Sequence, residues 1–306
     1  MIVTITLNPA IDKHIMVEEL YYDKTNIVKD KRVVYGGKGI NVSSYLSVLK
    51  QENIASGFMF SYDEKSFISN ISNDYTICDF LSVLGHTREN IKIDHKGKLL
   101  EFNDNNVVSC DDQQRFIEHF SKYCQKGNII VLSGSLPKGV SENLYYTLAK
   151  MAKDHGCYVI LDSSKQPLKY AYEYADVLKP NKEEFCYLFD LDDDTDLIKY
   201  ASSLNDKRLI VISLGSEGSL FIKDNVIYKV DPLNVEVSTT VGAGDAMVAA
   251  LAYGLENKLE LLDIMTLASA LSSLIITEDY KDNFEFKLET LKKQVQITKI
   301  QHLLSF

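Results

Sequence analysis

The chain lacks tryptophan altogether, has only 5 prolines in 306 residues, and opens without a basic leader. Its first apolar run, Ile2 to Leu7, is too short for the core of a signal sequence or for a membrane span, so we interpret it as a buried strand. With so few prolines and 15 glycines, most of the chain can lie in regular helices and strands. These absences favour an ordinary globular enzyme.

Disulfide motifs are also missing. The 5 cysteines are odd in number and none forms a CxxC pair, which favours a reducing, cytoplasmic compartment. The cysteines are Cys78, Cys110, Cys124, Cys157 and Cys186.

Positive charge is in short supply. Lys and Arg total 33 against 43 Asp and Glu, which gives a formal net charge of −10. Such a chain is a poor electrostatic match for nucleic acid or for an anionic membrane, so neither is an expected partner. A small anionic substrate is still compatible, because a few cations and backbone amides can build a local positive site.

Short apolar runs alternate with helical patterns along most of the chain. Strands that are apolar on both faces and separated by helices are typical of a mostly parallel sheet covered on both sides. The sequence therefore predicts an α/β fold, in one domain spanning 1–306. The clearest predicted strands are Ile2–Leu7, Asn128–Ser133, Tyr158–Asp162, Asp176–Lys179 and Leu209–Ser213. The predicted helices are Gly39–Lys50, Asp111–Lys126, Ser141–His155, Asn181–Asp190, Gly244–Glu256, Leu259–Thr277 and Phe286–Thr298.

Two segments, at about 13–35 and 88–104, interrupt this alternation. Both have the pattern of short antiparallel strands, and the second, NIKIDHKGKLLEFND, contains a turn signal at Lys96-Gly97. We expect the two segments to pair as a small separate sheet, acting as a lid over the carboxyl ends of the main strands.

The strongest chemical signal is Ser238 to Asp245, STTVGAGD, which is followed by the helical run AMVAALAYGL. Gly242 and Gly244 allow the backbone to present amide N–H groups where the helix dipole is positive, which makes a cradle for an anion. Taken alone, such a segment is more often a glycine-rich turn whose Asp caps the helix. Beside a phosphate cradle, however, the carboxylate of Asp245 would repel the ligand unless it had a chemical role.

A second glycine-rich segment, GGKGINV at 36–42, follows TITLNPAID at 4–12. It is no P-loop, since the spacer and the Lys-Ser/Thr ending are missing. Together with VGAGD, these segments resemble the signatures of the ribokinase/phosphofructokinase-B family of sugar kinases, and the resemblance covers nearly the whole chain. It implies a ribokinase-like three-layer sandwich with a small β-sheet lid. It also implies that Asp245 is the base that takes the proton of the sugar hydroxyl, while the amides of Gly242, Ala243 and Gly244 stabilise the transferring phosphoryl group.

The resemblance extends to a substrate that already carries a phosphate. TRENIKI at 87–93 and SGSLP at 133–137 are similar to segments of the phosphosugar kinases, where an Arg binds that phosphate. A guanidinium suits the group because its fork of donors matches the phosphate oxygens. Without the resemblance, Asp12 is more simply a solvated strand end, Asn41 a helix cap, and Lys24 and Lys92 surface cations. The implied substrate-binding residues are Asp12, Lys24, Gly36, Gly37, Lys38, Asn41, Arg88, Lys92, Asn103 and Ser135.

KPNKEE at 179–184 and SLGSEG at 213–218 mark the expected nucleotide side. In the family, the N-x-x-E pattern helps to place phosphate and a magnesium-bound water, and the second segment lines the ATP site; without the resemblance, the second is a β-turn. A carboxylate cage is not expected, because Mg²⁺ keeps several waters. The implied residues are Lys179, Asn181, Ser213, Gly215, Ser216 and Gly218 for ATP, and Glu184 for Mg²⁺ through water.

Within the family, TITLNPAID, GGKGINV, TRENIKI, LEFN, LDSSKQPL and GAGDAMV look closest to the 1-phosphofructokinases, with the tagatose-6-phosphate kinases next. The implied reaction is ATP-dependent phosphorylation of fructose 1-phosphate to fructose 1,6-bisphosphate, and the alternative is tagatose 6-phosphate to tagatose 1,6-bisphosphate. From another class, a non-catalytic sugar-phosphate sensor would bind the same ligand without releasing ADP. A dinucleotide-dependent oxidoreductase would need G-x-G-x-x-G after the first strand, where this chain has NPAID.

Two segments depart from the family pattern. MFSYDEKSF at 59–67 replaces a glycine-containing stretch, and IITEDYKDN at 275–283 lacks the glycine common beside the adenine. Because of the second departure, the sequence does not predict the shape of the nucleotide pocket. On the lid, we expect Ile91, Ile93, Leu99 and Phe102 to expose apolar faces, through which two lids would pair in a homodimer.

Overall fold

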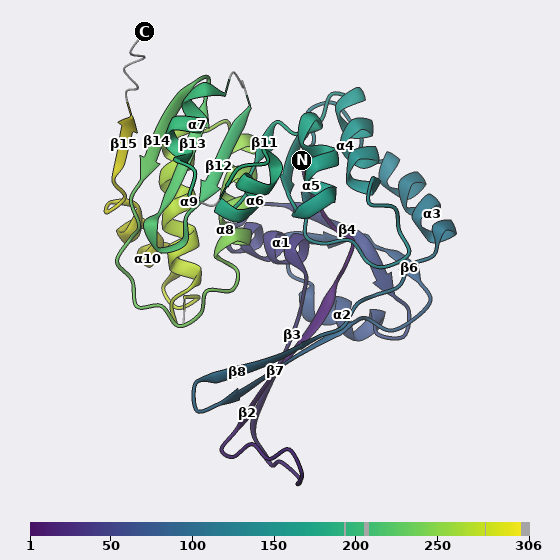
Figure 1. Ribbon diagram of the computed structural model, residues 1–306. Helices are drawn as coiled ribbons and strands as arrows, with labels where there is room; N and C mark the ends of the chain where they lie inside the picture. The colour runs from purple at the N-terminus through teal and green to yellow at the C-terminus, as the bar shows by residue number, and fades with distance from the viewer. Residues whose placement is uncertain (193, 205–207, 279, 301–306) are drawn as a thin grey trace.

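The computed structural model describes residues 1–192, 194–204, 208–278 and 280–300, and these form two sheets. A large sheet of 11 strands runs through the body with helices on both faces, and a separate sheet of 4 strands projects from the body (Figure 1). The α/β fold with a small separate sheet, as predicted from the sequence, is thus confirmed. None of the helices within the described ranges is long and apolar enough to cross a membrane.

The large sheet is parallel through its centre and antiparallel at one end. Its strands are β1 (Ile2–Thr6), β4 (Asn53–Phe60), β5 (Thr76–Cys78), β6 (Leu81–Val83), β9 (Ile129–Ser133), β10 (Tyr158–Asp162), β11 (Val177–Leu178), β12 (Leu209–Ser213), β13 (Ser219–Lys223), β14 (Val226–Val230) and β15 (Ile297–Ile300). The order is β15-β14-β13-β12-β11-β10-β9-β1-β4-β5, with β6 paired to the far part of β4. The pairs from β12 to β5 are parallel, whereas β12 to β15 pair antiparallel.

Helices cover both faces of this sheet. The helices are α1 (Lys38–Val48), α2 (Glu64–Ile71), α3 (Cys110–Ser121), α4 (Leu144–Asp154), α5 (Lys165–Ala171), α6 (Lys182–Leu188), α7 (Leu197–Ser203), α8 (Ala243–Glu256), α9 (Leu261–Ile275) and α10 (Phe284–Lys292), with 3-10 turns η1 (Tyr172–Tyr174) and η2 (Gly215–Glu217). Along β9, Ile130 and Leu132 enter a core shared with α3 to α7, whereas Ile129 and Val131 enter a core shared with α1 and α8 to α10. Because both faces are buried, the central strands are mostly apolar.

The small sheet, which we call the lid, consists of β2 (Ala10–Val17), β3 (Val28–Gly36), β7 (Glu89–His95) and β8 (Lys98–Asn103) in the order β3-β2-β7-β8. Each sequence segment forms an antiparallel pair, and β2 joins β7 in parallel. The predicted turn is present: Lys96 and Gly97 have φ of 52° and 79°. Two positive φ values suit a two-residue hairpin whose twist matches that of the strands.

The apolar side chains of the lid gather mainly on one face. Ile91 lies opposite Phe102 and Ile93 lies opposite Leu100, so these four share a face, on which Phe102 is 53% exposed. Leu99 lies opposite Asp94 and therefore belongs to the other face. Leu99 is exposed, as predicted, but it cannot join one apolar surface with the other three because side chains alternate along β8.

The C-terminal end also differs from the sequence prediction. The sequence predicts a helix over Phe286–Thr298, but α10 ends at Lys292 and the chain continues as β15. The open edge of β14 provides the pairing that turns this apolar stretch into a strand. The β13–β14 hairpin is likewise missing from the predicted strands, although its turn residues, Asp224 and Asn225, have the positive φ values of a two-residue hairpin.

Candidate active site

The predicted anion cradle lies at the start of α8. Gly242 precedes the helix with φ of 93°, and a Cβ there would lie 2.2 Å from the Tyr45 hydroxyl, so only glycine fits. A Cβ on Gly244 would lie 3.5 Å from Nζ of Lys179, which places this cation beside the cradle. The first N–H groups of a helix have no partner within it, so those of Ala243 and Gly244 are available to an anion.

Asp245 is buried in the first turn of α8, with only 6% of its surface exposed. Its Oδ2 accepts a hydrogen bond of 2.8 Å from Nδ2 of Asn41, in α1. Burial raises the pKa of Asp245 to about 6, and the charge of Asp162 adds to the rise, while Asn41, Lys38 and Lys179 oppose it. A carboxylate with this pKa is ionised at neutral pH and is basic enough to take a proton.

Asp162 is a wholly buried carboxylate at the end of β10. Nζ of Lys38 and Nζ of Lys179 each lie 3.2 Å from one of its oxygens, and Ser133 Oγ donates a hydrogen bond of 3.0 Å. Burial alone would raise the pKa of Asp162, but attraction to the two ammonium groups outweighs it and lowers the pKa. Asp162 therefore stays charged and holds both lysines in place.

The pKa of Lys38 responds to the same surroundings. Desolvation would lower it, but the attraction of Asp162 and Asp245 is stronger and raises the pKa. Lys38 is therefore a fixed positive charge between two carboxylates, and its side chain is still 42% exposed toward solvent.

A cavity of about 290 Å³ opens at the carboxyl ends of the central strands, beside Lys38. Four predicted site residues line it, namely Lys38, Arg88, Ser135 and Glu184. Its other lining residues were not among the predicted ones: Thr6, Asn8, Ser133, Gly134, Ser163 and Ser164. Oγ1 of Thr6 is buried without a hydrogen-bond partner among the described residues.

Arg88 lies where the lid joins the body. Its guanidinium donates to the carbonyls of Asn8 and Pro9 at 3.3 Å and to that of Asp104 at 3.5 Å. Burial lowers the pKa of Arg88, although nearby carboxylates oppose the shift and the group stays charged at neutral pH. These bonds hold the side chain at the rim of the cavity.

The turn before α1 shapes the space beside the cavity. Gly37 has φ of 136° and precedes α1, and a Cβ on it would lie 2.7 Å from Cγ2 of Thr6. A Cβ on Gly36 would lie 2.9 Å from Oδ1 of Asn41. Both glycines therefore allow a close approach that a side chain would block. Asp12, on β2, accepts a hydrogen bond of 2.8 Å from Asn90 of β7.

Three predicted substrate-binding residues lie outside this cluster. Lys24 is exposed in the loop between β2 and β3, with Nζ 5.4 Å from the ring centroid of Tyr21. Lys92 is on β7, and Asn103 is on β8, where it lines a different cavity of about 600 Å³ at the root of the lid. The described chain thus brings together the body residues and Arg88, but not these three.

The expected nucleotide segments meet at a neighbouring strand end. Asn181 bridges to Ser213, and both line a groove of about 520 Å³ together with Gly215. Gly218 has φ of 89°, and a Cβ on it would lie 2.1 Å from the carbonyl oxygen of Val230. Ser216 is exposed in the η2 turn. In the segment 275–283, position 279 lies outside the described residues.

Asn181 and Glu184 form a capping box at the start of α6. Oδ1 of Asn181 accepts from the amide of Glu184 at 2.7 Å, and Oε2 of Glu184 accepts from the amide of Asn181 at 2.9 Å. Glu184 also lines the cavity beside Lys38. No group of three or more His, Cys, Asp or Glu side chains suited to a metal ion occurs in the described part of the chain.

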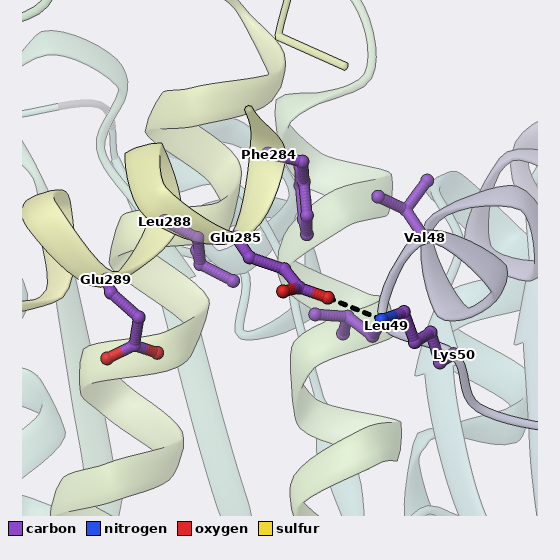
Figure 2. A pocket seen from close by; sticks show the side chains of 7 residues that line it. All are labelled: Val48, Leu49, Lys50, Phe284, Glu285, Leu288 and Glu289. Atoms are coloured by element: carbon purple, nitrogen blue, oxygen red, sulfur yellow. Dashed lines mark hydrogen bonds and ion pairs between the residues drawn. The ribbon is translucent and has the colours of Figure 1, made fainter. Parts of the chain in front are cut away.

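A further cavity, of about 260 Å³, lies at the other end of α1 against α10 (Figure 2). Lys50 and Glu285 form an ion pair of 2.5 Å across it, and Leu49 and Leu288 contribute apolar lining. Asn41, which donates to Asp245, lies in the first turn of α1, whereas this cavity lies beyond its last turn; since an 11-residue helix is about 16 Å long, the cavity is well separated from Asp245. None of the predicted site residues lines it.

Comparisons with known proteins show which family the chain resembles as a whole. Residues 3–284 match the model of the pfkB family carbohydrate kinases. A tagatose-6-phosphate kinase of Staphylococcus epidermidis (strain ATCC 12228) is 31% identical, over 98% of this chain and 100% of its own. Among solved structures, a Staphylococcus aureus protein with a provisional assignment as a phosphofructokinase is 28% identical with a TM-score of 0.84, covering 98% of this chain and 99% of its own.

Two further solved structures have the same fold. A Thermotoga maritima protein, provisionally assigned as a 1-phosphofructokinase, is 25% identical with a TM-score of 0.84, covering 98% of this chain and 100% of its own. Phosphofructokinase-2 of Escherichia coli, in complex with potassium, is 24% identical with a TM-score of 0.85, over 95% of this chain and 98% of its own. The family model and the 31% identical relative both span nearly the whole chain, and this chain therefore belongs to the pfkB family of carbohydrate kinases.

Proposed function

We propose that this protein transfers the γ-phosphoryl group of ATP to a hydroxyl of a ketohexose phosphate, with Asp245 as the base. The observation that carries the proposal is the placement of Asp245: a buried carboxylate beside a helix N-terminal anion cradle, with Lys38 and Lys179 held nearby by Asp162. Phosphoryl transfer needs positioning, positive charge and one group that orients the nucleophile, and this arrangement offers all of them.

In the proposed reaction, Asp245 accepts the proton of the attacking sugar hydroxyl. The hydroxyl oxygen forms a bond to the γ-phosphorus, the bond from that phosphorus to the β-phosphate oxygen breaks, and ADP leaves. The amides of Gly242, Ala243 and Gly244 stabilise charge on the transferring group. Lys179, beside this cradle, adds positive charge at the same place.

The substrate's own phosphate would be bound in the cavity of about 290 Å³. Arg88, Lys38 and Ser135 line it and present donors that suit phosphate oxygens. Gly36, Gly37, Asn41 and Asp12 would contact the sugar. Lys24, Lys92 and Asn103 are assigned to the substrate by the family resemblance alone.

The nucleotide would lie along the segments that end β11 and β12. Asn181, Ser213, Gly215, Ser216 and Gly218 supply small side chains and strand-end backbone, the usual surroundings of a ligand in an open α/β sheet. Glu184 gives Oε2 to its capping box, so Oε1 is the oxygen left to accept from a water bound to Mg²⁺. When bound, Mg²⁺ supplies positive charge to the phosphate oxygens.

Fructose 1-phosphate, giving fructose 1,6-bisphosphate, is the proposed substrate, on the motif resemblance set out above and the fold shared with the Thermotoga maritima protein. Tagatose 6-phosphate is the second candidate, because a relative 31% identical over its whole length bears that name. The two reactions use the same base and cradle, so the choice concerns only the residues around the sugar.

We also propose that the protein is a cytoplasmic homodimer paired through its lids, with each lid excluding water from the site below it. No disulfide joins any of the 5 cysteines, all of which lie within the described residues, as expected in a reducing compartment. Ile91, Ile93, Leu100 and Phe102 form the apolar lid face that a second lid would cover. Light scattering at micromolar concentration should give twice the chain mass of 34.6 kDa, and a species of 34.6 kDa alone would contradict the dimer.

ADP release from Mg·ATP tests the function directly, with fructose 1-phosphate, tagatose 6-phosphate, fructose 6-phosphate and fructose supplied separately. Preference for fructose 1-phosphate supports the proposal, and preference for tagatose 6-phosphate supports the second candidate. Binding of a sugar phosphate without ADP release would instead favour a non-catalytic sensor. A preference for unphosphorylated fructose would contradict the assignment of Arg88 to a substrate phosphate.

A further inference from the structure

A row of cations crosses the lid from strand to strand. Arg32 on β3 lies opposite His14 on β2, which lies opposite Lys92 on β7, and Lys92 lies opposite Glu101 on β8. Residues directly opposite on neighbouring strands point to the same face, with Cβ atoms about 5 Å apart. Arg32, His14 and Lys92 therefore lie side by side, and we call them the lid cation row.

The lid cation row shares its face with Asp12 and Asn90, which are two residues nearer to the body. The other face carries Ile11 and Tyr35, and Tyr35 packs edge-on against Phe67 of α2 at 5.2 Å. The row therefore points away from α2, toward the side of the lid on which Asp12 lies.

On the body, Tyr280, in the segment that follows α9, is affected by the charge of Arg32. Burial raises the pKa of Tyr280, and the positive charge of Arg32 opposes this rise. Arg32 is thus within electrostatic reach of the body, next to the segment expected to border the nucleotide. From that segment, the row runs across the lid to its last member, Lys92. Lys92 lies on β7, the strand that begins beside Arg88.

The row differs from other cations of the lid because none of its members forms an ion pair with a described residue, although Glu101 lies opposite Lys92 and Asp12, Asp30 and Asp94 lie on the same face. Lys13 pairs with Glu89, Lys29 with Glu18 at 2.8 Å, and Lys96 with Glu19 at 2.8 Å. Within the described part of the chain, no ion pair is formed by Arg32, His14 or Lys92.

When His14 is protonated, it lies directly opposite two like charges, Arg32 and Lys92; such pairs destabilise a sheet, and a bound anion would offset the repulsion. The pKa of His14 is affected by this repulsion. Partial burial lowers the pKa of His14, Lys92 and Arg32 lower it further, and Asp12 and Glu101 act in the opposite direction. An anion bound to the row would reverse the effect of the two cations and raise the pKa of His14.

We propose that Arg32, His14 and Lys92 together form a subsite for a phosphate group on the inner face of the lid. The inference rests on the proposed function, which supplies phosphate groups from the sugar phosphate and from the nucleotide. A guanidinium fork, an imidazolium and an ammonium offer complementary donors to the oxygens of one phosphate. Arg32 and His14 extend the anion site beyond Arg88 and the body lysines, along the lid.

The test is the pKa of His14, followed by NMR of the histidine rings in the whole protein, with the His14→Gln variant used for assignment. We expect the pKa of free His14 to be below the usual value and to rise when phosphate occupies the row. Separate titrations with fructose 1-phosphate, tagatose 6-phosphate, Mg·ADP and inorganic phosphate identify the source of that phosphate. Unphosphorylated fructose should leave the pKa of His14 unchanged.

Two variants separate this role from a structural one. Arg32→Ala should raise KM for the ligand that shifts His14 about tenfold, with kcat changed less than twofold, and it should raise the pKa of His14 in the free protein. Lys29→Ala removes a cation from the same strand, β3, but one already paired with Glu18, and should change neither quantity. Equal effects of the two substitutions on KM and on the pKa of His14 would overturn the subsite.

The outcomes also distinguish this inference from the proposed function. If a sugar phosphate is turned over but none of the phosphate ligands shifts His14, the row is not a phosphate subsite and the kinase function stands. If no sugar phosphate is turned over while Mg·ADP or inorganic phosphate raises the pKa of His14, the proposed function fails and the subsite stands.

Discussion

The candidate active site at the strand ends and the lid differ in how the charges of their side chains are compensated. At the strand ends, Asp162 is 1% exposed and is held between Lys38 and Lys179, so its charge is compensated inside the protein. On the lid, Arg32, His14 and Lys92 stand together and form no ion pair within the described ranges, although Glu101 lies opposite Lys92. Buried, paired charges are costly to disturb, whereas exposed ones are screened and adaptable. Substitutions at the strand ends should therefore affect folding and kcat, and those at the lid should affect KM.

Apart from substitution of the proposed base itself, Asp162→Asn should have the largest effect on both stability and turnover. Removing one partner of a buried ion pair leaves uncompensated charge, here that of Lys179, and we expect a loss of about 3 kcal/mol in the free energy of unfolding. Without the anchor for both lysines, kcat should fall by about a hundredfold. The acidic limb of kcat should also move to lower pH, because Asp162 helps to raise the pKa of Asp245. Denaturant unfolding and pH profiles measure these effects.

Asp176→Asn is the matched control for that substitution. Asp176 also accepts from a lysine, Lys153 at 2.6 Å, and from the amide of Val159 at 2.8 Å, but it lies at the opposite end of the strands. The Asp176→Asn substitution should lower the free energy of unfolding without moving the pH profile of kcat. An unmoved profile in Asp162→Asn would contradict the electrostatic link to Asp245.

Arg88→Lys should have the next largest effect. It keeps one positive charge but loses the planar fork that bridges three backbone carbonyls and matches a phosphate. We expect KM for the sugar phosphate to rise about tenfold, with a smaller change in kcat and none in KM for ATP. A selective increase in KM for ATP would instead place Arg88 on the nucleotide side.

The pH dependence of the unmodified enzyme should show a smaller, graded effect. Asp245 must be ionised to act as a base, and burial raises its pKa to about 6. Activity should therefore be full above this pKa and fall as the pH drops through about 6, roughly tenfold for each pH unit below it. An acidic limb near pH 4 would mean that the base is a carboxylate with an ordinary pKa.

Lys50→Ala should have the smallest effect. Lys50 and Glu285 are 64% and 74% exposed, and exposed pairs contribute little to stability. We expect less than about 0.5 kcal/mol of change and unaltered kinetics, because the cavity that this pair crosses is remote from Asp245. A large kinetic effect would assign a role to the cavity of Figure 2.

The sequence predicts the centre of the fold better than its edges. Strands such as Ile129–Ser133 are apolar on both faces, so composition alone reveals them. Ile297–Ile300 becomes a strand only because β14 has an open edge, and no local pattern contains that information. The side on which Leu99 lies depends on the pairing of β8 with β7, and this register fixes the face of every lid residue.

The candidate site shows the same limit. Asp245 and its glycines stand in a contiguous motif, and Lys38 and Arg88 in short segments of their own, so each could be proposed from sequence. Asp162 was missed, although it ends a predicted strand in the segment Leu161-Asp-Ser-Ser. Its importance comes from two lysines that are 124 and 17 residues away in the chain, and only the parallel pairing of β10 and β11 and the start of α1 bring them together.

The most direct measurement is the turnover of Asp245→Asn with Mg·ATP and whichever sugar phosphate the unmodified enzyme prefers. The isosteric amide keeps the hydrogen-bonding position beside Asn41 but cannot take a proton. It also removes a buried charge whose pKa is raised in the folded protein, so above about pH 7 the variant should be at least as stable as the original. The account predicts unchanged binding of both substrates and a kcat at least about a thousandfold lower. Full turnover in a folded Asp245→Asn protein would contradict it.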